Sequence, residues 1–155
     1  MTKFELISKY ADQDGLLPKR ETKFSAGYDF KAAVDVTIPG INLNGDACVP
    51  LESVLVPTGV KVKLEKDQVL ILANRSSNAL KRNLIIPNGI GVIDSDYYNN
   101  PDNEGEIMGL FINIGKNDYH IHKGDRIMQG IITSYAVAEN DQAQGKRNGG
   151  FGSTN

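Results

Sequence analysis

The sequence has 155 residues, enough for one domain, and its 40% hydrophobic and 23% charged content is ordinary for a soluble globular protein. The net charge of −2 lacks the basic surplus of a nucleic-acid-binding domain, so we expect no direct binding to nucleic acid. No apolar run approaches the about 18 residues that span a membrane, and the N-terminus lacks an apolar signal core, so we expect a cytoplasmic protein without membrane contact.

Short apolar runs recur along the chain between Gly, Pro and Asn residues, which is typical of an all-β sandwich or barrel. We expect strands at residues 3–8, 52–56, 60–64, 69–73, 84–86, 90–93, 106–114, 119–121 and 126–135. Only residues 76–82 have a helical pattern. The sequence therefore predicts an all-β domain with one short helix over residues 1–138, followed by a flexible C-terminal arm over residues 139–155.

The segment 26–30, Ala-Gly-Tyr-Asp-Phe, places one carboxylate inside an otherwise apolar stretch. Burying an ionised carboxylate is costly unless it is paired with a cation. We therefore expect Asp29 to have a charged partner or a bound ion.

The helical segment begins with two serines, and either Ser76 or Ser77 could cap it. Free amides at the start of a helix bind anions, and the cationic Arg75 directly precedes them. The Arg75-Ser76-Ser77 turn is thus a candidate phosphate site. An ordinary capped turn is the alternative interpretation.

The segment 88–97, Asn-Gly-Ile-Gly-Val-Ile-Asp-Ser-Asp-Tyr, is the most informative part of the sequence. Asn-Gly is a strong turn dipeptide and strand-forming residues follow it, so we expect a β-hairpin here. The segment ends in polar groups: Asp94, Asp96 and Tyr97. A glycine-rich hairpin of this kind could hold a small planar ligand with its backbone, or it could be a surface hairpin with solvated aspartates.

The polar segments that follow differ in character. Residues 99–105 form an expected exposed loop, and Arg126 and Gln129 provide a further cation and amide. The arm carries the sequence Gly-Lys-Arg-Asn-Gly-Gly-Phe-Gly-Ser-Thr-Asn at residues 145–155. Such an arm could close over a ligand, because glycine amides bind phosphate, cations neutralise its charge and an aromatic ring stacks on a base. A disordered tail is the alternative.

Together these parts suit a nucleoside triphosphate with a divalent cation, and their order closely resembles the trimeric dUTPases of bacteria and bacteriophages. Five motifs carry the resemblance: AGYDF at 26–30, RSSNALK at 75–81, NGIGVIDSDY at 88–97, GDRIMQ at 124–129 and RNGGFGST at 147–154. The resemblance implies a jelly-roll-like β subunit and a homotrimer whose active sites are shared between subunits. The segment 88–97 would come from one subunit, the phosphate motifs from a neighbour and the arm from the third.

The resemblance also implies the reaction, which is hydrolysis of dUTP to dUMP and pyrophosphate. Asp94 would activate the water that attacks the α-phosphorus. Mg²⁺ would bind the triphosphate, with Asp29 as an anchor through a water molecule. Arg126 would either touch phosphate or orient Asp94. The substrate-binding residues implied are Arg75, Ser76, Ser77, Asn88, Gly91, Ile93, Tyr97, Arg126, Gln129, Arg147, Gly150, Phe151, Gly152 and Ser153.

Some positions depart from the family pattern. Asn74 stands where many relatives have proline, and either Lys146 or Arg147 would contact the terminal phosphate. Two other functions share this fold: a dCTP deaminase, and a nucleotide-binding or regulatory protein without catalysis. The sequence favours the hydrolase because the Asp-Ser-Asp-Tyr sequence and the Gly-Gly-Phe-Gly arm fit its pattern better.

Overall fold

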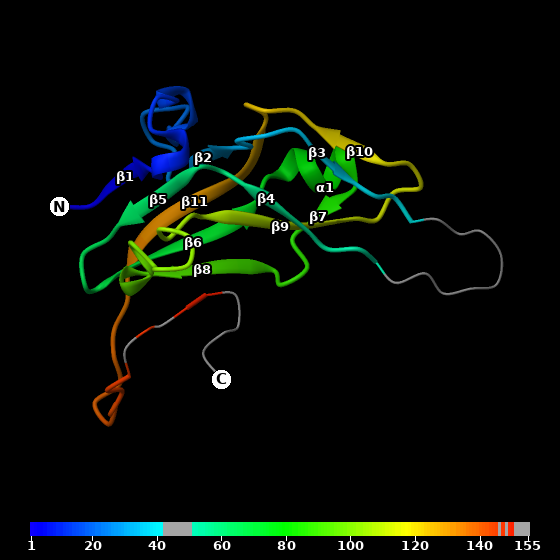
Figure 1. Cartoon of the computed structure of the whole chain (residues 1–155). Helices are drawn as coiled ribbons and strands as arrows, with labels where there is room; N and C mark the ends of the chain where they lie inside the picture. Colours follow the sequence, from blue (N-terminus) through cyan, green and yellow to red (C-terminus); the bar gives the residue numbers. More distant parts are fainter. Residues whose placement is uncertain (42–50, 146, 148, 151–155) are drawn as a thin grey trace.

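The computed structural model describes residues 1–41, 51–145, 147, 149 and 150. Within these residues the chain is built of strands with one short α-helix (Figure 1), which confirms the all-β prediction. The strands are β1 (Lys3–Leu6), β2 (Tyr28–Lys31), β3 (Val36–Ile38), β4 (Val54–Pro57), β5 (Val60–Lys63), β6 (Gln68–Asn74), β7 (Leu84–Ile85), β8 (Ile90–Asp94), β9 (Met108–Asn113), β10 (Tyr119–Ile121) and β11 (Arg126–Ser134). The helix is α1 (Ser76–Arg82).

The strands form two principal sheets and two smaller pairs. The larger sheet has the order β2-β11-β6-β8 and the smaller β4-β9-β7, while β1 pairs with β5 and β3 with β10. All of these pairings are antiparallel. In the larger sheet β11 and β6 run side by side along most of their length (Figure 1), so the β6–β11 ladder is the central strand pair of this sheet.

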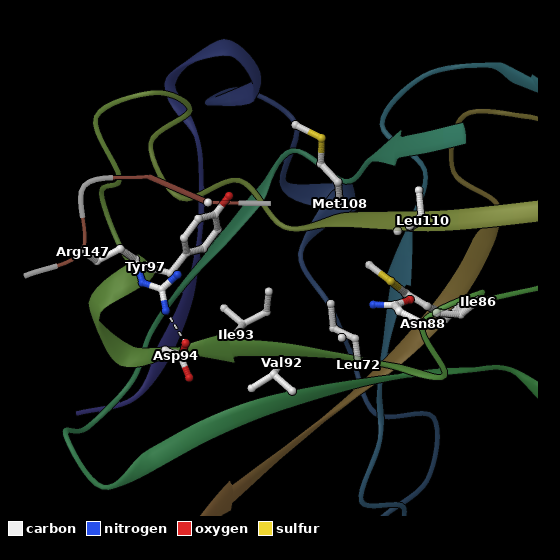
Figure 2. Close-up of a pocket in the computed structure, with 14 residues that line it drawn as sticks. Leu72, Ile86, Asn88, Val92, Ile93, Asp94, Tyr97, Met108, Leu110 and Arg147 are labelled. Carbon is white, nitrogen blue, oxygen red and sulfur yellow. Dashed lines mark hydrogen bonds and ion pairs between the residues drawn. The ribbon is translucent and has the colours of Figure 1, made fainter. Parts of the chain in front are cut away.

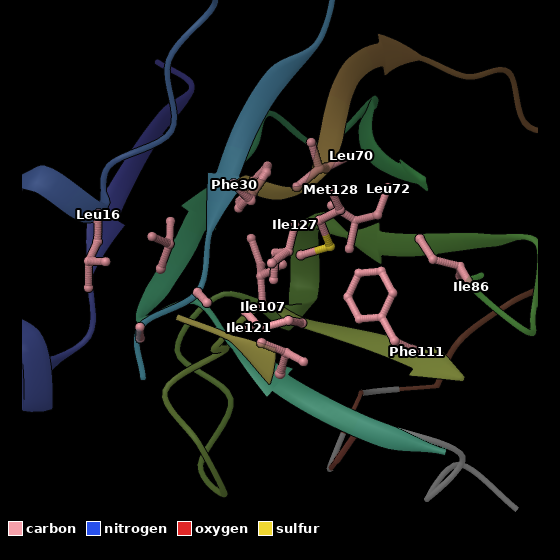
Figure 3. Packing of buried hydrophobic residues seen from close by; sticks show 14 of the residues in the cluster. Leu16, Phe30, Leu70, Leu72, Ile86, Ile107, Phe111, Ile121, Ile127 and Met128 are labelled. Atoms are coloured by element: carbon pink, nitrogen blue, oxygen red, sulfur yellow. The ribbon is translucent and has the colours of Figure 1, made fainter. Parts of the chain in front are cut away.

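The core lies where side chains of these two sheets meet (Figure 3). Phe30, Leu70 and Met128 from the larger sheet and Phe111 from β9 are fully buried. Fully burying one such side chain contributes about 1.5–3 kcal/mol. The absence of a side chain at Gly130 leaves space for the Phe30 ring, because a Cβ at residue 130 would lie 2.6 Å from that ring.

The predicted strands agree with the structure to within a few residues, but β2 and β3 were not expected. In β2, Phe30 is buried while the Asp29 carboxylate projects to the other face. This alternation is the strand pattern, but it covers only four residues, and Asp29 interrupts the apolar run that would mark a fully buried strand. Beyond Ser134, the described residues up to Gly145 form no helix or strand. The boundary between domain and arm at residue 138 remains a prediction.

The prediction that the Asn88-Gly89 turn closes a hairpin is wrong. Gly89 has the expected left-handed φ of 76°, but the strands on either side of the turn belong to different sheets. β7 pairs with β9, and β8 pairs with β6. Pro87 interrupts the chain between them, and a residue without an N–H cannot extend a ladder from β7 onto β8. The turn therefore carries the chain from one sheet to the other.

In the described part of the chain, no helix has the length and apolar character needed to cross a bilayer.

Glu106 is a buried carboxylate in the loop that precedes β9. It is 7% exposed, and its Oε1 accepts a hydrogen bond of 2.9 Å from the backbone N–H of Gly59. Burial raises the pKa of the Glu106 carboxyl above its ordinary value of 4.5. Its protonated form therefore contributes stability that is fully present below the pKa of the unfolded chain and is lost as the pH rises through the folded pKa.

We predict that Glu106→Gln weakens this pH dependence. Between the ordinary glutamate pKa and the raised folded value, the unfolding free energy of the variant should fall less steeply with pH than that of the wild type. Urea unfolding over a series of pH values measures this, with Glu139→Gln, on an exposed side chain, as the matched control. Identical slopes for Glu106→Gln and wild type would show that Glu106 does not carry the effect.

Candidate active site

A cavity of about 300 Å³ lies between β8 and β9 (Figure 2). Its walls come from β6, β8, β9, β11, the Asn88 turn, the short helical turn after β8 and the arm. The lining residues are Leu72, Ile86, Asn88, Gly91, Val92, Ile93, Asp94, Tyr97, Met108, Gly109, Leu110, Met128, Arg147 and Gly150. Most of them are apolar, and polar side chains stand at the two ends. Figure 2 shows Asn88 at one end and Asp94 with Arg147 at the other.

Gly91 keeps the wall of this cavity open. It lies opposite Leu72 in the β6–β8 ladder, and a Cβ at residue 91 would be 3.1 Å from both Cβ and Cδ1 of Leu72. Ile93 follows two residues later on the same face of the strand, as strand periodicity requires. The glycine therefore leaves room for a flat ligand beside the β8 backbone.

Arg147 pairs with two carboxylates at the second end of the cavity. Its Nε donates a hydrogen bond of 2.7 Å to Asp96 Oδ1, and its Nη2 pairs with Asp94 Oδ2. The hydrogen bond to Asp96, with the negative charges of both aspartates, raises the pKa of Arg147. One arm residue thus pairs with both acids of the segment 88–97.

Tyr97 closes the same end. The Arg147 guanidinium lies over its ring at 5.9 Å from the centroid. A Cβ at residue 150 would lie 2.7 Å from Tyr97 Cε2, so Gly150 packs directly against the ring edge. The arm and the tyrosine therefore form one contiguous wall.

A second polar cluster surrounds Asp29. Its carboxylate accepts from Arg75 Nε at 3.1 Å and from Arg126 Nη1 at 3.3 Å. Arg126 also pairs with Glu21 at 2.8 Å. The expected partner of Asp29 is thus a pair of guanidinium groups. The sequence also allows Arg126 to orient Asp94. Within one chain Arg126 contacts Asp29 and Glu21 instead, and Arg147 is the residue that pairs with Asp94.

Gln129 belongs to the second cluster. It lies opposite Asp29 in the β2–β11 ladder, and its Nε2 donates a hydrogen bond of 3.2 Å to the Asn74 carbonyl. A Cβ at Gly27 would lie 2.6 Å from Gln129 Oε1. The glycine of the segment 26–30 therefore leaves the space that the Gln129 amide occupies.

Ser76 and Ser77 begin α1 beside this cluster, but the prediction that one of them caps the helix is wrong. The N-cap is Arg75, whose backbone is extended, and no side-chain cap bond forms there. The buried Asn78 holds the helix instead, because its Nδ2 donates a hydrogen bond of 2.6 Å to the Ile127 carbonyl. The first turn is thus fixed to β11 without using either serine hydroxyl.

The two polar clusters lie at opposite ends of β6. In the β6–β8 ladder Asp94 is opposite Val69, and Ile90 is opposite Ala73. Arg75 stands six residues beyond Val69, which is about 20 Å of extended chain. Within one chain, Arg75 is therefore next to the Asn88 end of the cavity and far from Asp94.

The structure brings many predicted site residues together in these two places. The cavity contains Asn88, Gly91, Ile93, Asp94, Tyr97, Arg147 and Gly150, and the second cluster contains Asp29, Arg75, Arg126 and Gln129. Phe151, Gly152 and Ser153, with Lys146, lie outside the described residues.

Sequence reasoning missed the apolar walls, chiefly Leu72, Met108 and Met128. Nothing in an alternating strand pattern distinguishes a cavity wall from the core. It also missed Asp96 as the partner of Arg147. The two aspartates and the cations of the arm were a signal of opposite charge, but their long sequence separation gave no reason to pair them.

Comparison with known proteins agrees with this geometry. The profile of the family described as dUTPase matches residues 13–155. The deoxyuridine 5'-triphosphate nucleotidohydrolase of Lactococcus lactis subsp. lactis is 42% identical over 153 residues, which cover 97% of this chain and 95% of the relative. This chain belongs to the dUTPase family. The resemblance found in the five sequence motifs is therefore confirmed, and so is the enzyme class.

Solved dUTPase structures share the fold. The crystal structure of dUTPase from Streptococcus mutans has a TM-score of 0.80 at 40% identity, covering 89% of this chain and 99% of that one. The dUTPase of Staphylococcus bacteriophage 80alpha has a TM-score of 0.69 at 22% identity, covering 95% and 98%, and shows likeness of fold alone. The predicted dUTPase jelly-roll fold is thus confirmed.

The Asp29 cluster gives a prediction about stability. Asp29→Asn removes the charge that two guanidinium groups share in a site where Asp29 is only 14% exposed, so we expect a loss of about 1–3 kcal/mol in unfolding free energy. Glu21→Gln is the matched control, because Glu21 pairs with the same Arg126 but is 61% exposed. An exposed pair contributes about 0–1 kcal/mol.

Urea unfolding of both variants checks this ranking. A loss for Glu21→Gln that equals or exceeds the loss for Asp29→Asn would contradict it.

Proposed function

We propose that this dUTPase-family chain hydrolyses dUTP to dUMP and pyrophosphate, with Asp94 as the general base. The observation that carries the proposal is the position of Asp94 at one end of an apolar cavity that begins at Asn88. If the nucleobase of dUTP binds along β8, the sugar and the α-phosphate would point toward Asp94. A carboxylate within about 2.6–3.2 Å of a water can take its proton during in-line attack on phosphorus. The name of the Lactococcus lactis relative, deoxyuridine 5'-triphosphate nucleotidohydrolase, supports the choice of substrate.

Uracil recognition would use the free edge of β8. Among the described strands, β8 pairs only with β6, so its outer N–H and C=O groups are available to a ligand. These groups, with the Asn88 side chain, would match the O4, N3–H and O2 edge of uracil. Cytosine reverses two of those polarities and would leave buried groups unpaired at about 1–3 kcal/mol each.

The phosphate groups would be held by Arg75, Ser76, Ser77, Arg126 and Gln129 of a neighbouring copy. Within one chain Arg75 lies beside the Asn88 end, where the base would bind, and about 20 Å of strand separates it from Asp94. A bound nucleotide cannot present its base and its phosphates to the same end. A homotrimer with shared active sites resolves this conflict.

The arm would close over the nucleotide. Arg147 now pairs with Asp94 and Asp96, and a general base must be free of such a partner to accept a proton. The phosphates of a nucleotide would draw Arg147 away from Asp94 by the same charge attraction. Gly150, Gly152 and Ser153 would then line the phosphates while Phe151 stacks on the base.

Mg²⁺ would be held mainly by oxygens of the triphosphate and by water, and would neutralise phosphate charge. The described residues contain no group of three or more His, Cys, Asp or Glu side chains that could hold a metal ion by themselves. Asp29 already accepts from Arg75 and Arg126. Because its carboxylate oxygens already accept these hydrogen bonds, Asp29 suits contact with the ion through a water molecule and does not suit direct ligation.

The test is pyrophosphate release from dUTP with Mg²⁺, run beside dCTP, dTTP and UTP. We expect release from dUTP in strong preference to the others, and a loss of at least about 10²-fold in kcat for Asp94→Asn, the range typical of a lost general base. Asp67→Asn, on an exposed side chain in the turn before β6 that does not line the cavity, is the matched control and should retain wild-type rates.

Other outcomes would select the alternatives. Ammonia release from dCTP would indicate a deaminase. No product from any nucleotide with a folded protein would indicate a binding or regulatory protein of this fold. Full activity of Asp94→Asn would exclude Asp94 as the base.

A further inference from the structure

The loop after β8, residues 98–106, has a defined shape. Asn99, Glu104 and Gly105 adopt left-handed φ values of 58°, 60° and 79°. Two polar anchors tie the loop to other elements. The Glu104 carboxylate accepts a 3.1 Å hydrogen bond from the backbone N–H of Ser8, and Lys61 Nζ donates one of 2.7 Å to Asn99 Oδ1. A loop that is held at both ends in this way can serve as a rigid support.

Asn103 projects from this loop toward the cavity wall. Its Oδ1 accepts a 3.0 Å hydrogen bond from the Gly105 N–H, and its Nδ2 donates one of 2.8 Å to the Tyr97 hydroxyl. The Tyr97 hydroxyl in turn lies 3.4 Å from the Glu106 carbonyl oxygen. Both ends of the Asn103 amide are thus occupied, which fixes its orientation, and the tyrosine hydroxyl is held between two groups of one loop.

We propose that Asn103 is a positioning residue that fixes the Tyr97 ring against the sugar of the nucleotide and thereby sets the preference for deoxyribose over ribose. The inference rests on the proposed function, in which the sugar of dUTP lies between the base at β8 and Asp94. Tyr97 is 6% exposed and lines the cavity beside Asp94. The preference arises because a 2′-hydroxyl would need the space that the ring fills.

Exclusion of one hydroxyl group requires a ring held to within about 0.5 Å. Two further neighbours of the ring, Arg147 and Gly150, belong to the arm. According to the proposed function, these residues change partners when nucleotide binds. Asn103 belongs to the domain itself, so its hydrogen bond can hold the ring in every state of the arm.

Close packing supports the same assignment. A Cβ at Gly105 would lie 2.4 Å from the Tyr97 carbonyl oxygen, and the Asn100 N–H donates a 3.1 Å hydrogen bond to that oxygen. The loop therefore holds the tyrosine by its backbone at one end and by its hydroxyl at the other. Loss of the Asn103 amide would remove its bonds to the Tyr97 hydroxyl and to the Gly105 N–H, while the Asn100 bond to the Tyr97 carbonyl remains, so the ring could tilt about its own backbone.

The experiment measures kcat/KM for dUTP and for UTP in four variants: Asn103→Ala, Tyr97→Phe, the double variant and Asp102→Ala. Asp102 is the matched control, because it is exposed and adjoins Asn103 in the same loop. We expect Asn103→Ala to narrow the ratio of dUTP to UTP by about three- to tenfold, the effect of one buried neutral hydrogen bond. Tyr97→Phe should narrow it by a similar factor, and the double variant should be no worse than either.

The ratio of kcat/KM for dUTP to that for UTP distinguishes a positioning role of Asn103 from a purely structural one. A purely structural Asn103 would lower thermal stability and both rates together and would leave the ratio unchanged, which would overturn the inference. Additive losses in the double variant would also overturn it, because they would show that the two groups act independently. Failure of the wild type to hydrolyse dUTP would instead refute the proposed function, so the two failures are distinguishable.

Discussion

The antiparallel register between β6 and β8 is the constraint on which the rest of the site depends. It places Asp94 opposite Val69 and Ile90 opposite Ala73. A shift by one residue would turn Gly91 and Ile93 to the opposite face of β8. The same register sends Arg75 to the far end of the ladder from Asp94. In the proposed function, this separation is the reason why a second copy would have to supply the phosphate-binding residues.

Ion pairs join acidic and basic side chains at both places that would form the site. Arg75 and Arg126 converge on Asp29, and Arg147 bridges Asp94 and Asp96. The cost of an unpaired carboxylate applies chiefly to Asp29, which is 14% exposed, because Asp94 and Asp96 are 47% and 57% exposed and stay partly solvated. In the proposed function, the phosphates of the nucleotide would compete for the same guanidinium groups, so nucleotide binding would release the aspartates from these ion pairs. The arginine that neutralises Asp94 without nucleotide is, in this account, the one that engages phosphate with it.

Much of this fold could be predicted from local sequence, and the exceptions have identifiable causes. The helix at Ser76–Arg82 agrees with its predicted bounds, because a short helical run after a strand needs only local pattern. β2 was not predicted because its alternating pattern covers only four residues and Asp29 interrupts the apolar run. The turn at Asn88-Gly89 was expected to pair its flanking strands, and only the tertiary partners of β7 and β8 show that it joins two sheets.

The same limit applies to the candidate site: the chemistry of single residues could be predicted from the sequence, but contacts between distant segments could not. The motifs identified Asp94, Arg75 and Gln129 as residues with the required chemistry. They could not predict that Arg147 pairs with Asp96, or that Asn103 holds Tyr97, because both contacts join segments whose approach is set by the fold. The apolar wall at Leu72 and Met108 was equally invisible, since a cavity wall and a core have the same composition.

The most direct test of the shared site is complementation between two inactive variants, Asp94→Asn and Arg75→Ala. Each variant is assayed alone and after mixing under conditions that exchange subunits, with mixed oligomers verified by native mass spectrometry. If Asp94 and Arg75 of one site come from different copies, about a quarter of the sites in a random equal mixture carry both intact residues, and dUTP hydrolysis returns in that proportion. If both residues come from the same chain, the mixed oligomers stay inactive, and the account of the register between β6 and β8 as the origin of a shared site is contradicted.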